Sequence, residues 1–521
     1  MLVRLPGFKR SAANVAAIWL LQAGTLLFAL VSMPLVTHRF GLEGLGVWLL
    51  VQQIASLFQL LELGLASSLG RILSRDLALH DANCFTEHTS SAITILLLLG
   101  GALIVLALPL GMAFPHAFEL PSNLARDAVW MLAIAILATG LALPLRSALG
   151  ILSCQHHFAL LAFGDGLALI LRVFLIIAAC TMVSDHALIA LSLAVFAPGF
   201  LGALGLFLVA ARFSSYDLFK VRSVGLKAVR VLLEISLANM VVTLAAFLLR
   251  QGSSMLVGYS LSAESVPLIA LPMMLVVSIG PFLGIANQLI SPVASQMDSC
   301  NLIKDLQCVY LSAVRYTLAT GLLIFIGIVI LVPDLLPLWI GKNIFDLHQI
   351  QLLHINILMV FAGYCIATPA FLARSVLVSV GKHRIAAKGE LFGSLMGIFI
   401  GWILMYMLGW GATGMACGIA IAYLLRAFGV LMRELALYFD MSLVRLYGEM
   451  WLRPLLSSIP LLFVLIPAQL SDLGMRDLAL YSIPALALWA WFAFRLIVPA
   501  SHREILCRSL RDAISIYRRG A

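Results

Sequence analysis

The sequence has little charge and no cysteine pattern. Only 11% of its 521 residues are charged and 62% are hydrophobic, whereas a soluble domain has about 25% charged residues. The eight cysteines are scattered without paired spacing, which argues against a disulfide framework or a cysteine-based metal site. The composition therefore excludes a soluble globular protein and indicates a polytopic membrane protein.

Motifs for several kinds of chemistry are also missing. The chain has no G-x-x-x-x-G-K-[ST] loop, which excludes ATP hydrolysis by that route, and no H-E-x-x-H zinc motif. It has no D-x-D pair and no long segment outside the membrane, which disfavours a membrane glycosyltransferase or polymerase. We therefore expect no catalytic residue, metal or cofactor, and nothing in the sequence suggests nucleic-acid binding.

What the chain does have is a series of long apolar segments. Taking about 20 apolar residues as one crossing, we predict an all-α protein with about fourteen transmembrane helices. The predicted spans are residues 13–36, 46–70, 91–113, 127–152, 158–182, 186–211, 231–259, 266–291, 308–332, 350–378, 387–408, 412–432, 452–470 and 478–499. The first span exceeds the roughly 7–15 apolar residues of a signal peptide, so we expect it to be retained.

The basic residues predict the orientation of these spans. With the N-terminus in the cytoplasm, 22 of the 33 lysines and arginines fall in cytoplasmic segments, four lie outside and seven lie within spans. This is the bias that the positive-inside rule describes, and one miscounted span would scramble it. We therefore predict that both termini are cytoplasmic. The net charge of +9 also favours contact with anionic lipids of the inner leaflet.

A basic linker over residues 212–230 divides the predicted spans. We predict an N-terminal six-helix bundle over residues 1–211, a C-terminal one over 231–432, and two extra helices with a basic tail over 433–521. An even number of spans in each half predicts a pseudo-two-fold axis along the membrane normal. Weak internal repeats support this duplication, because residues 40–46 resemble 261–267 and residues 146–149 (RSAL) resemble 374–377 (RSVL).

Seven arginines lie inside the predicted spans, namely Arg146, Arg172, Arg250, Arg315, Arg374, Arg426 and Arg495. An arginine near the membrane centre costs roughly 2.5–3.5 kcal/mol, so it normally faces a protein interior or a wet cavity. Arg426 and Arg495 lie one to two turns from the cytoplasmic end, where snorkelling explains them. We predict that the other five are cavity cations for an anionic substrate. Arg172 and Arg250 lie deepest and are the strongest candidates.

Three acidic residues, Glu62, Asp165 and Glu390, are candidate ion-coupling sites. Arg374 and Glu390 lie at similar depths on adjacent antiparallel helices and can therefore pair, and Arg146 and Asp165 are spaced in almost the same way. Each pair is a salt bridge that lets the arginine enter the membrane, part of a central cavity, or both. Glu62 is either a proton or cation site or the partner of an arginine.

Several stretches together resemble a known family of membrane proteins. Residues 40–48 (FGLEGLGVW) lead to 61–65 (LELGL), and residues 335–341 (LLPLWIG) lead to 380–384 (VGKHR) and 411–414 (GATG). These stretches resemble the polysaccharide-flippase branch of the multidrug/oligosaccharidyl-lipid/polysaccharide exporter superfamily, particularly its O-antigen flippases. The similarity covers most of the first twelve predicted spans.

The resemblance implies a transporter rather than an enzyme. Two six-helix bundles would alternate access and move an undecaprenyl-diphosphate-linked oligosaccharide from the inner to the outer leaflet of the bacterial cytoplasmic membrane, coupled to an ion gradient. Arginine suits such a substrate because it offers a permanent charge and bidentate geometry for phosphate. The implied partners are the lipid-linked oligosaccharide and membrane lipids, with a polysaccharide polymerase and other glycan-assembly proteins as further candidates.

Two alternatives remain open. A multidrug exporter, or an exporter of another lipid-linked precursor, belongs to the same superfamily, but a drug exporter would more naturally keep acidic sites for cationic drugs. A non-transport role, as a membrane polymerase or as a scaffold in glycan assembly, is disfavoured by the short outer loops.

Overall fold

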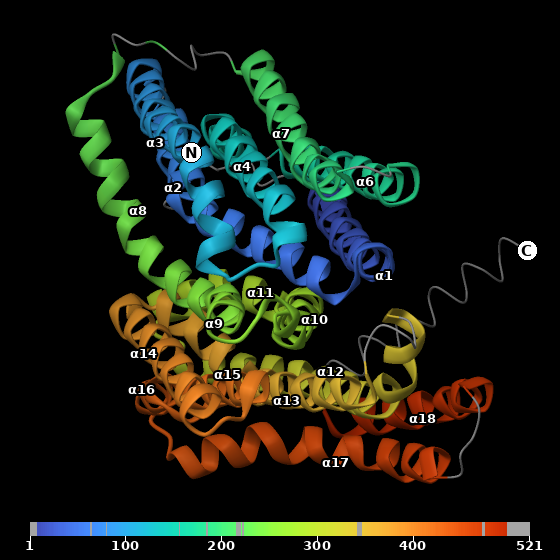
Figure 1. Ribbon diagram of the computed structural model, residues 1–521. Coiled ribbons are helices and arrows are strands. Elements are labelled where there is room, and N and C mark those ends of the chain that lie inside the picture. The colour runs from blue at the N-terminus through green and yellow to red at the C-terminus, as the bar shows by residue number, and fades with distance from the viewer. Residues whose placement is uncertain are drawn as a thin grey trace, which may run out of the picture. The chain divides into compact units, whose positions relative to one another are not determined.

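The computed structural model of the chain is helical throughout the part that it describes. It describes residues 8–497 apart from 63–64, 80, 156, 184–185, 215–219, 221–222, 341–345 and 471–474, so the predicted basic C-terminal tail lies outside the described residues. Figure 1 shows helices and no strand in this part of the chain. The predicted all-α class is therefore confirmed.

The helices follow the predicted spans closely. They are α1 (Phe8–Gln59), α2 (Leu65–Ala78), α3 (Ala82–Ala117), α4 (Ser122–Leu145), α5 (Ser147–Cys154), α6 (Phe158–Met182), α7 (Ala187–Phe213), α8 (Leu226–Phe247), α9 (Ser253–Ser260), α10 (Pro267–Leu283), α11 (Ile285–Ser299), α12 (Ile303–Ile340), α13 (Leu347–Ser379), α14 (His383–Trp402), α15 (Gly411–Phe428), α16 (Val430–Tyr438), α17 (Leu443–Leu470) and α18 (Met475–Leu496). Short 3₁₀ turns occur at Leu60–Glu62 and Ala263–Ser265, and π-helical segments at Leu248–Gly252 and Ile403–Met407.

Ten helical stretches among the described residues are long and apolar enough to cross a membrane. The predicted multi-pass membrane protein is therefore confirmed. The count of fourteen crossings, the choice of membrane and the cytoplasmic orientation of both termini stay predictions.

The chain forms two compact units. The first comprises Met1–Met274, Trp339–Ile350 and Ile398–Met415, and the second comprises Leu275–Leu338, Gln351–Gly397 and Ala416–Ala521. Within the first unit, two residues of the predicted linker are bound to α3: the backbone N–H groups of Lys220 and Gly225 donate to the Ser90 and Ser91 hydroxyls at 2.9 and 3.3 Å. The predicted boundaries and the two-fold relation between six-helix bundles stay predictions.

Two predicted spans are joined in α1, a helix of 52 residues. Gly41 interrupts it with φ +68° and ψ −169°, a backbone conformation that glycine adopts without steric cost. The chain is helical on both sides of this residue, although the sequence predicted a loop between residues 36 and 46. Beyond the kink, α1 packs so closely on Ala263 that a Cβ atom at Gly46 would overlap the Ala263 carbonyl oxygen.

Helices α3 and α4 touch backbone to backbone. A Cβ atom at Gly100 would overlap the carbonyl oxygen of Gly140, and one at Gly140 would lie 2.9 Å from the carbonyl oxygen of Gly100. Small residues allow such close approach between helices in membranes. Because Arg146 follows the last residue of α4, this seam helps to position a predicted site residue.

We expect Gly100→Ala to destabilise the protein by about 1–3 kcal/mol, because the added methyl group forces two backbones apart. The neighbouring Gly101 provides a matched control, since a Cβ atom there meets no atom within 4 Å. Gly101→Ala should therefore be neutral or stabilising by up to about 1 kcal/mol, because alanine favours the helix. Unfolding of both variants in the same lipid nanodiscs measures the difference, and equal stabilities would contradict the seam.

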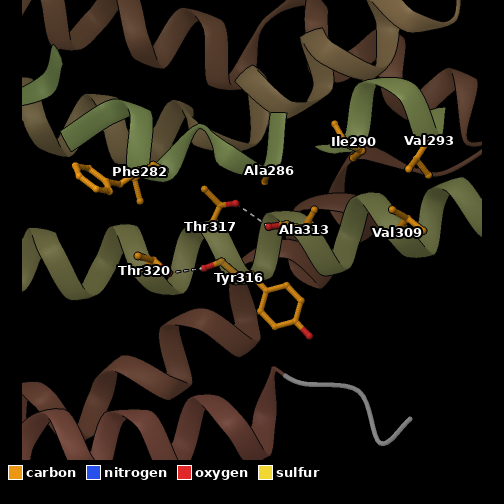
Figure 2. A pocket seen from close by; sticks show the side chains of 10 residues that line it. Phe282, Ala286, Ile290, Val293, Val309, Ala313, Tyr316, Thr317 and Thr320 are labelled. Carbon is orange, nitrogen blue, oxygen red and sulfur yellow. Dashed lines mark hydrogen bonds between the residues drawn. The ribbon is translucent and has the colours of Figure 1, made fainter. Parts of the chain in front are cut away.

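The second unit holds an apolar cavity of about 390 Å³ against α12. Figure 2 shows Val309, Ala313, Thr317 and Thr320 of α12 alongside Phe282, Ala286, Ile290 and Val293, whereas the Tyr316 ring points away from them. The two threonine hydroxyls donate within their own helix, Thr317 to the Ala313 carbonyl oxygen at 2.8 Å and Thr320 to that of Tyr316 at 3.0 Å. The cavity wall is therefore almost wholly apolar.

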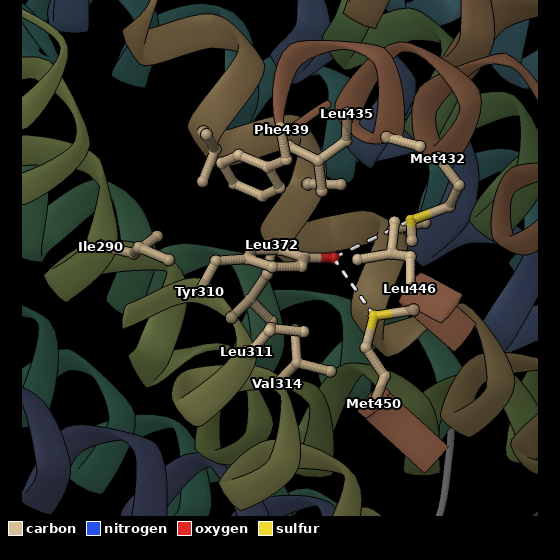
Figure 3. Close-up of a cluster of buried hydrophobic side chains, with 14 of the residues drawn as sticks. Ile290, Tyr310, Leu311, Val314, Leu372, Met432, Leu435, Phe439, Leu446 and Met450 are labelled. Carbon is tan, nitrogen blue, oxygen red and sulfur yellow. Dashed lines mark hydrogen bonds between the residues drawn. The ribbon is translucent and has the colours of Figure 1, made fainter. Parts of the chain in front are cut away.

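The core of the second unit surrounds Tyr310 of α12. This side chain is fully buried, and its hydroxyl donates to the Pro369 carbonyl oxygen of α13 at 3.0 Å. The Met432 and Met450 sulfur atoms lie 3.9 and 3.7 Å from the same hydroxyl, as Figure 3 shows. Four helices, α12, α13, α16 and α17, thus meet around one residue.

Candidate functional site

Two cavities of the first unit meet at a pair of arginines. Their volumes are about 430 and 230 Å³, and both are lined by Arg146, Arg172 and Gly199. The larger cavity is otherwise lined by Leu21, Thr25, Phe28, Leu145, Ala148, Leu149, Asp165, Ala168, Leu169, Gly202, Ala203 and Leu206. The smaller is otherwise lined by Gln52, Ser56, Ala138, Thr139, Ala142, Leu143, Val195, Phe196 and Phe200. Ligand pockets are typically about 300–1,000 Å³, so the two together have the size of a binding site.

Arg172 of α6 lies in the wall between these cavities. Its guanidinium carbon is 5.8 Å from the centre of the Phe28 ring, and a Cβ atom at Gly199 would lie 3.4 Å from its Nη2. Glycine at position 199 therefore leaves room for the guanidinium. The Nε atom is buried and, among the described residues, has no hydrogen-bond acceptor. None of the described carboxylates lies within the 4.0 Å of an ion pair with Arg172. The geometry leaves this cation open to an anionic ligand.

Arg146 is the second cation of the site, and it is paired. Its Nη1 lies 2.9 Å from Glu62 Oε2, with exposed side-chain fractions of 34% and 13%. Of the two interpretations of Glu62, the structure therefore shows the arginine partner. The expected pair of Arg146 with Asp165 is not formed within 4.0 Å among the described residues. Asp165 instead lines the larger cavity together with both guanidinium groups.

A second cluster of charges lies inside the second unit. Glu390 of α14, 3% exposed, has its Oε2 3.1 Å from Nη2 of Arg426, which is 5% exposed. The same Nη2 donates to the Ser394 hydroxyl at 2.6 Å. The predicted partner, Arg374, lies at the outer limit, 4.0 Å from Glu390 Oε1, and its side chain is 36% exposed. The interpretation of Arg426 as a snorkelling residue is therefore wrong, because it is buried and paired.

The other candidate cations have different surroundings. Arg250 lies in the π-helical segment of the first unit, where its Nε donates to the Ala246 carbonyl oxygen at 3.4 Å, and it lines neither of the two cavities. Arg315 donates from Nε to the Glu449 carbonyl oxygen at 2.8 Å and pairs with the Glu449 carboxylate at 3.5 Å, which ties α12 to α17. The apolar cavity beside α12 has no charged lining residue in the described structure and therefore cannot bind an anion by charge.

Sequence reasoning missed the polar and aromatic residues of the smaller cavity. Gln52 and Ser56 are four residues apart in an apolar stretch of α1, and Phe196 and Phe200 are four apart on α7. Residues at this spacing share one face of a helix. A search for polar pairs at that spacing within predicted spans would have identified the first of these two sets.

Several solved structures have a fold similar to that of this chain. The lipid II flippase MurJ in an inward closed conformation matches with a TM-score of 0.71 and 13% identity over 92% of this chain and 98% of that one. An inward-facing multidrug resistance MATE family transporter of the MOP superfamily matches with a TM-score of 0.66 and 15% identity, over 81% and 96%. A MOP superfamily transporter from Pyrococcus furiosus gives 0.58 and 16%, over 84% and 96%. At such identities the likeness shows the fold.

The sequence itself matches a protein-family model. No curated protein sequence matches it significantly. The family of polysaccharide biosynthesis proteins, however, matches residues 11–298, which is more than half of the chain and includes every residue of the two arginine-lined cavities. The chain therefore belongs to the polysaccharide biosynthesis protein family.

Proposed function

We propose that the chain is a flippase for a lipid-linked oligosaccharide diphosphate. Its substrate would be an undecaprenyl-diphosphate-linked repeat unit, of O-antigen or a related polysaccharide, moved from the inner to the outer leaflet of the bacterial cytoplasmic membrane. The family membership supports a role in polysaccharide assembly, and the shared fold with MOP superfamily transporters supports transport by alternating access.

The main support for the proposal is that Arg172 has no ion-pair partner among the described residues. A cation inside a membrane protein is costly unless it meets an anion or water, yet this guanidinium has no carboxylate partner among the described residues and lines two cavities. A guanidinium binds phosphate oxygens in a bidentate manner. Arg172, with Arg146 beside it in the same two cavities, therefore suits a diphosphate.

We propose that the acidic residues help to release the diphosphate from the arginines and to couple transport to an ion gradient. Glu62 holds Arg146 at 2.9 Å, so a diphosphate that binds Arg146 competes with this carboxylate. Asp165 lines the same cavity without an ion pair to any described residue and is the candidate site for a coupling ion. Glu390 has a weaker claim, because Arg426 already neutralises it. Of the remaining predicted cations, Arg250, Arg315 and Arg374, none lines the two cavities.

A multidrug exporter is the main alternative, and the cavity disfavours it. Two guanidinium groups and one carboxylate line the larger cavity, an arrangement that repels a cationic drug and attracts an anion. A non-transport scaffold in glycan assembly would not require a cation in an internal cavity.

Binding to the purified full-length protein in nanodiscs tests the proposed function. We expect a sugar-free polyprenyl diphosphate to bind at least about tenfold more tightly than the polyprenyl alcohol of the same length, because charge-assisted hydrogen bonds contribute about 1.5–3 kcal/mol. Tetraphenylphosphonium, a lipophilic cation, should not compete. Equal binding of the alcohol and the diphosphate, or competition by the cation, would show that the cavity does not select an anion.

A further inference from the structure

The two cavities that meet at the arginine pair differ in chemistry. In the larger one, Thr25 is the only polar residue besides the charged ones among the described lining residues. Its hydroxyl donates to the Leu21 carbonyl oxygen of its own helix at 2.9 Å. Leucine, phenylalanine, alanine and glycine form the remainder of that wall. In the smaller cavity, an amide, two hydroxyls and two phenyl rings stand beside the arginines.

The polar groups of the smaller cavity can still bind a ligand. The Ser56 hydroxyl donates to the Gln52 carbonyl oxygen at 2.7 Å, and the Thr139 hydroxyl donates to that of Ala135 at 2.7 Å. Each hydroxyl oxygen keeps the capacity to accept a hydrogen bond, and the Gln52 amide can both donate and accept. Phe196 and Phe200 share one face of α7 and line the same space. A sugar has hydroxyls at its edge and apolar C–H faces, which this combination matches.

The cavities also follow a fixed order along two helices. On α4 and α5, residues between 138 and 143 line the smaller cavity and residues between 145 and 149 line the larger one. On α7, residues between 195 and 200 line the smaller cavity and residues between 199 and 206 line the larger one. The predicted topology runs both α4 and α7 from the outside to the cytoplasm. In this topology the smaller cavity therefore lies further from the cytoplasm than the larger one.

We propose that the smaller cavity is the subsite for the first sugar of the lipid-linked glycan. The arginine pair then holds the diphosphate, and the leucine, phenylalanine and alanine side chains of the larger cavity contact the first hydrocarbon units of the lipid. This assignment rests on the proposed function and adds an orientation of the substrate to it. The glycan lies toward the outside, ahead of the diphosphate, and the lipid lies toward the cytoplasmic side.

Binding of two lipids that differ by one sugar, to the native protein and to variants of the cavity, tests this subsite. The ligands are polyprenyl diphosphates of equal chain length, one sugar-free and one bearing a single N-acetylhexosamine, bound to the full-length protein in nanodiscs. We expect the native protein to prefer the sugar-bearing lipid by about tenfold, as two to three added hydrogen bonds would give. The Gln52→Leu/Thr139→Val double variant should lose most of that preference and keep its affinity for the sugar-free lipid.

Thr94→Val is the matched control, because it removes a hydroxyl that is also bonded within its own helix, to the Ser90 carbonyl oxygen at 2.8 Å, but lines neither cavity. It should keep the preference, whereas Phe200→Leu, on a different helix from Gln52 and Thr139, should lower it. A native protein that binds both lipids equally, or a preference that Thr94→Val abolishes as fully as the double variant, would overturn the sugar subsite. Failure of the sugar-free lipid to bind at all would instead contradict the proposed function.

Discussion

Replacing Arg172 with glutamine is expected to lower the rate of lipid-linked glycan transport by about ten- to a hundredfold. Hydrogen bonds to a charged group contribute about 1.5–3 kcal/mol, and each 1.4 kcal/mol is a factor of ten. The same change should not reduce the stability of the protein, because Arg172 has no ion-pair partner among the described residues and its buried Nε lacks an acceptor. Loss of transport without loss of stability is the signature of a binding residue.

Arg495→Gln is the control for this experiment. Arg495 is also an arginine of an apolar helix, and its guanidinium carbon lies 5.7 Å from the Trp491 ring centre, as Arg172 lies 5.8 Å from that of Phe28. It lines neither arginine-walled cavity. Surface glycan in cells with equal amounts of each variant measures transport. Normal export by Arg172→Gln, or an equal defect in Arg495→Gln, would refute the anion site.

The largest effect on stability is expected at the Glu390–Arg426 pair. Removing one partner of a buried salt bridge leaves an uncompensated charge and costs about 3–5 kcal/mol. Both side chains are almost fully buried, at 3% and 5% exposed, and their closest atoms are 3.1 Å apart. We therefore expect Glu390→Gln and Arg426→Gln each to shift unfolding in nanodiscs strongly toward lower denaturant concentration.

Two further variants test whether the loss of stability comes from breaking the Glu390–Arg426 ion pair or from any substitution in this region. Arg374→Gln removes the second arginine beside the same carboxylate, but that side chain is 36% exposed and 4.0 Å away, so a loss of only about 0–1 kcal/mol is expected. Replacing Glu390 and Arg426 together with methionine should be neutral or stabilising by about 1–4 kcal/mol. A cost for Arg374→Gln as large as that for Arg426→Gln would contradict the assigned pairing.

The positions of the helices were predictable because they depend on local properties. Apolar length alone placed a span at residues 158–182, and α6 has those bounds. The same reasoning placed a loop between residues 36 and 46, where the structure has helix broken only at Gly41. A few polar residues are enough to end a predicted apolar span. A helix, however, ends only where its backbone hydrogen bonds are interrupted.

The sequence predicted how deep the charged residues lie in the membrane, but not which neighbouring helix each side chain faces. Sequence spacing placed Arg374 and Glu390 at one level, and they do lie 4.0 Å apart. Spacing does not say which neighbouring helix an arginine faces, so it missed Glu62 as the partner of Arg146 and Glu390 as the partner of Arg426. Glu390 and Ser394 share one face of α14 and both bind Arg426, a pattern that becomes informative only once α14 and α15 are known to be neighbours.

The close approach of Gly100 and Gly140 bears on how the cavities can change shape. Gly140 is adjacent to Thr139, which lines the smaller cavity, and Arg146 follows the last residue of α4, so at this seam the wall cannot come closer to α3. Arg172 is carried by α6, which packs on α7 rather than on this seam. Because α7 also packs on α4, any widening or narrowing of the gap between the two guanidinium groups requires α6 to move relative to α4. The separation of Arg146 and Arg172 would therefore report the position of α6 relative to α4.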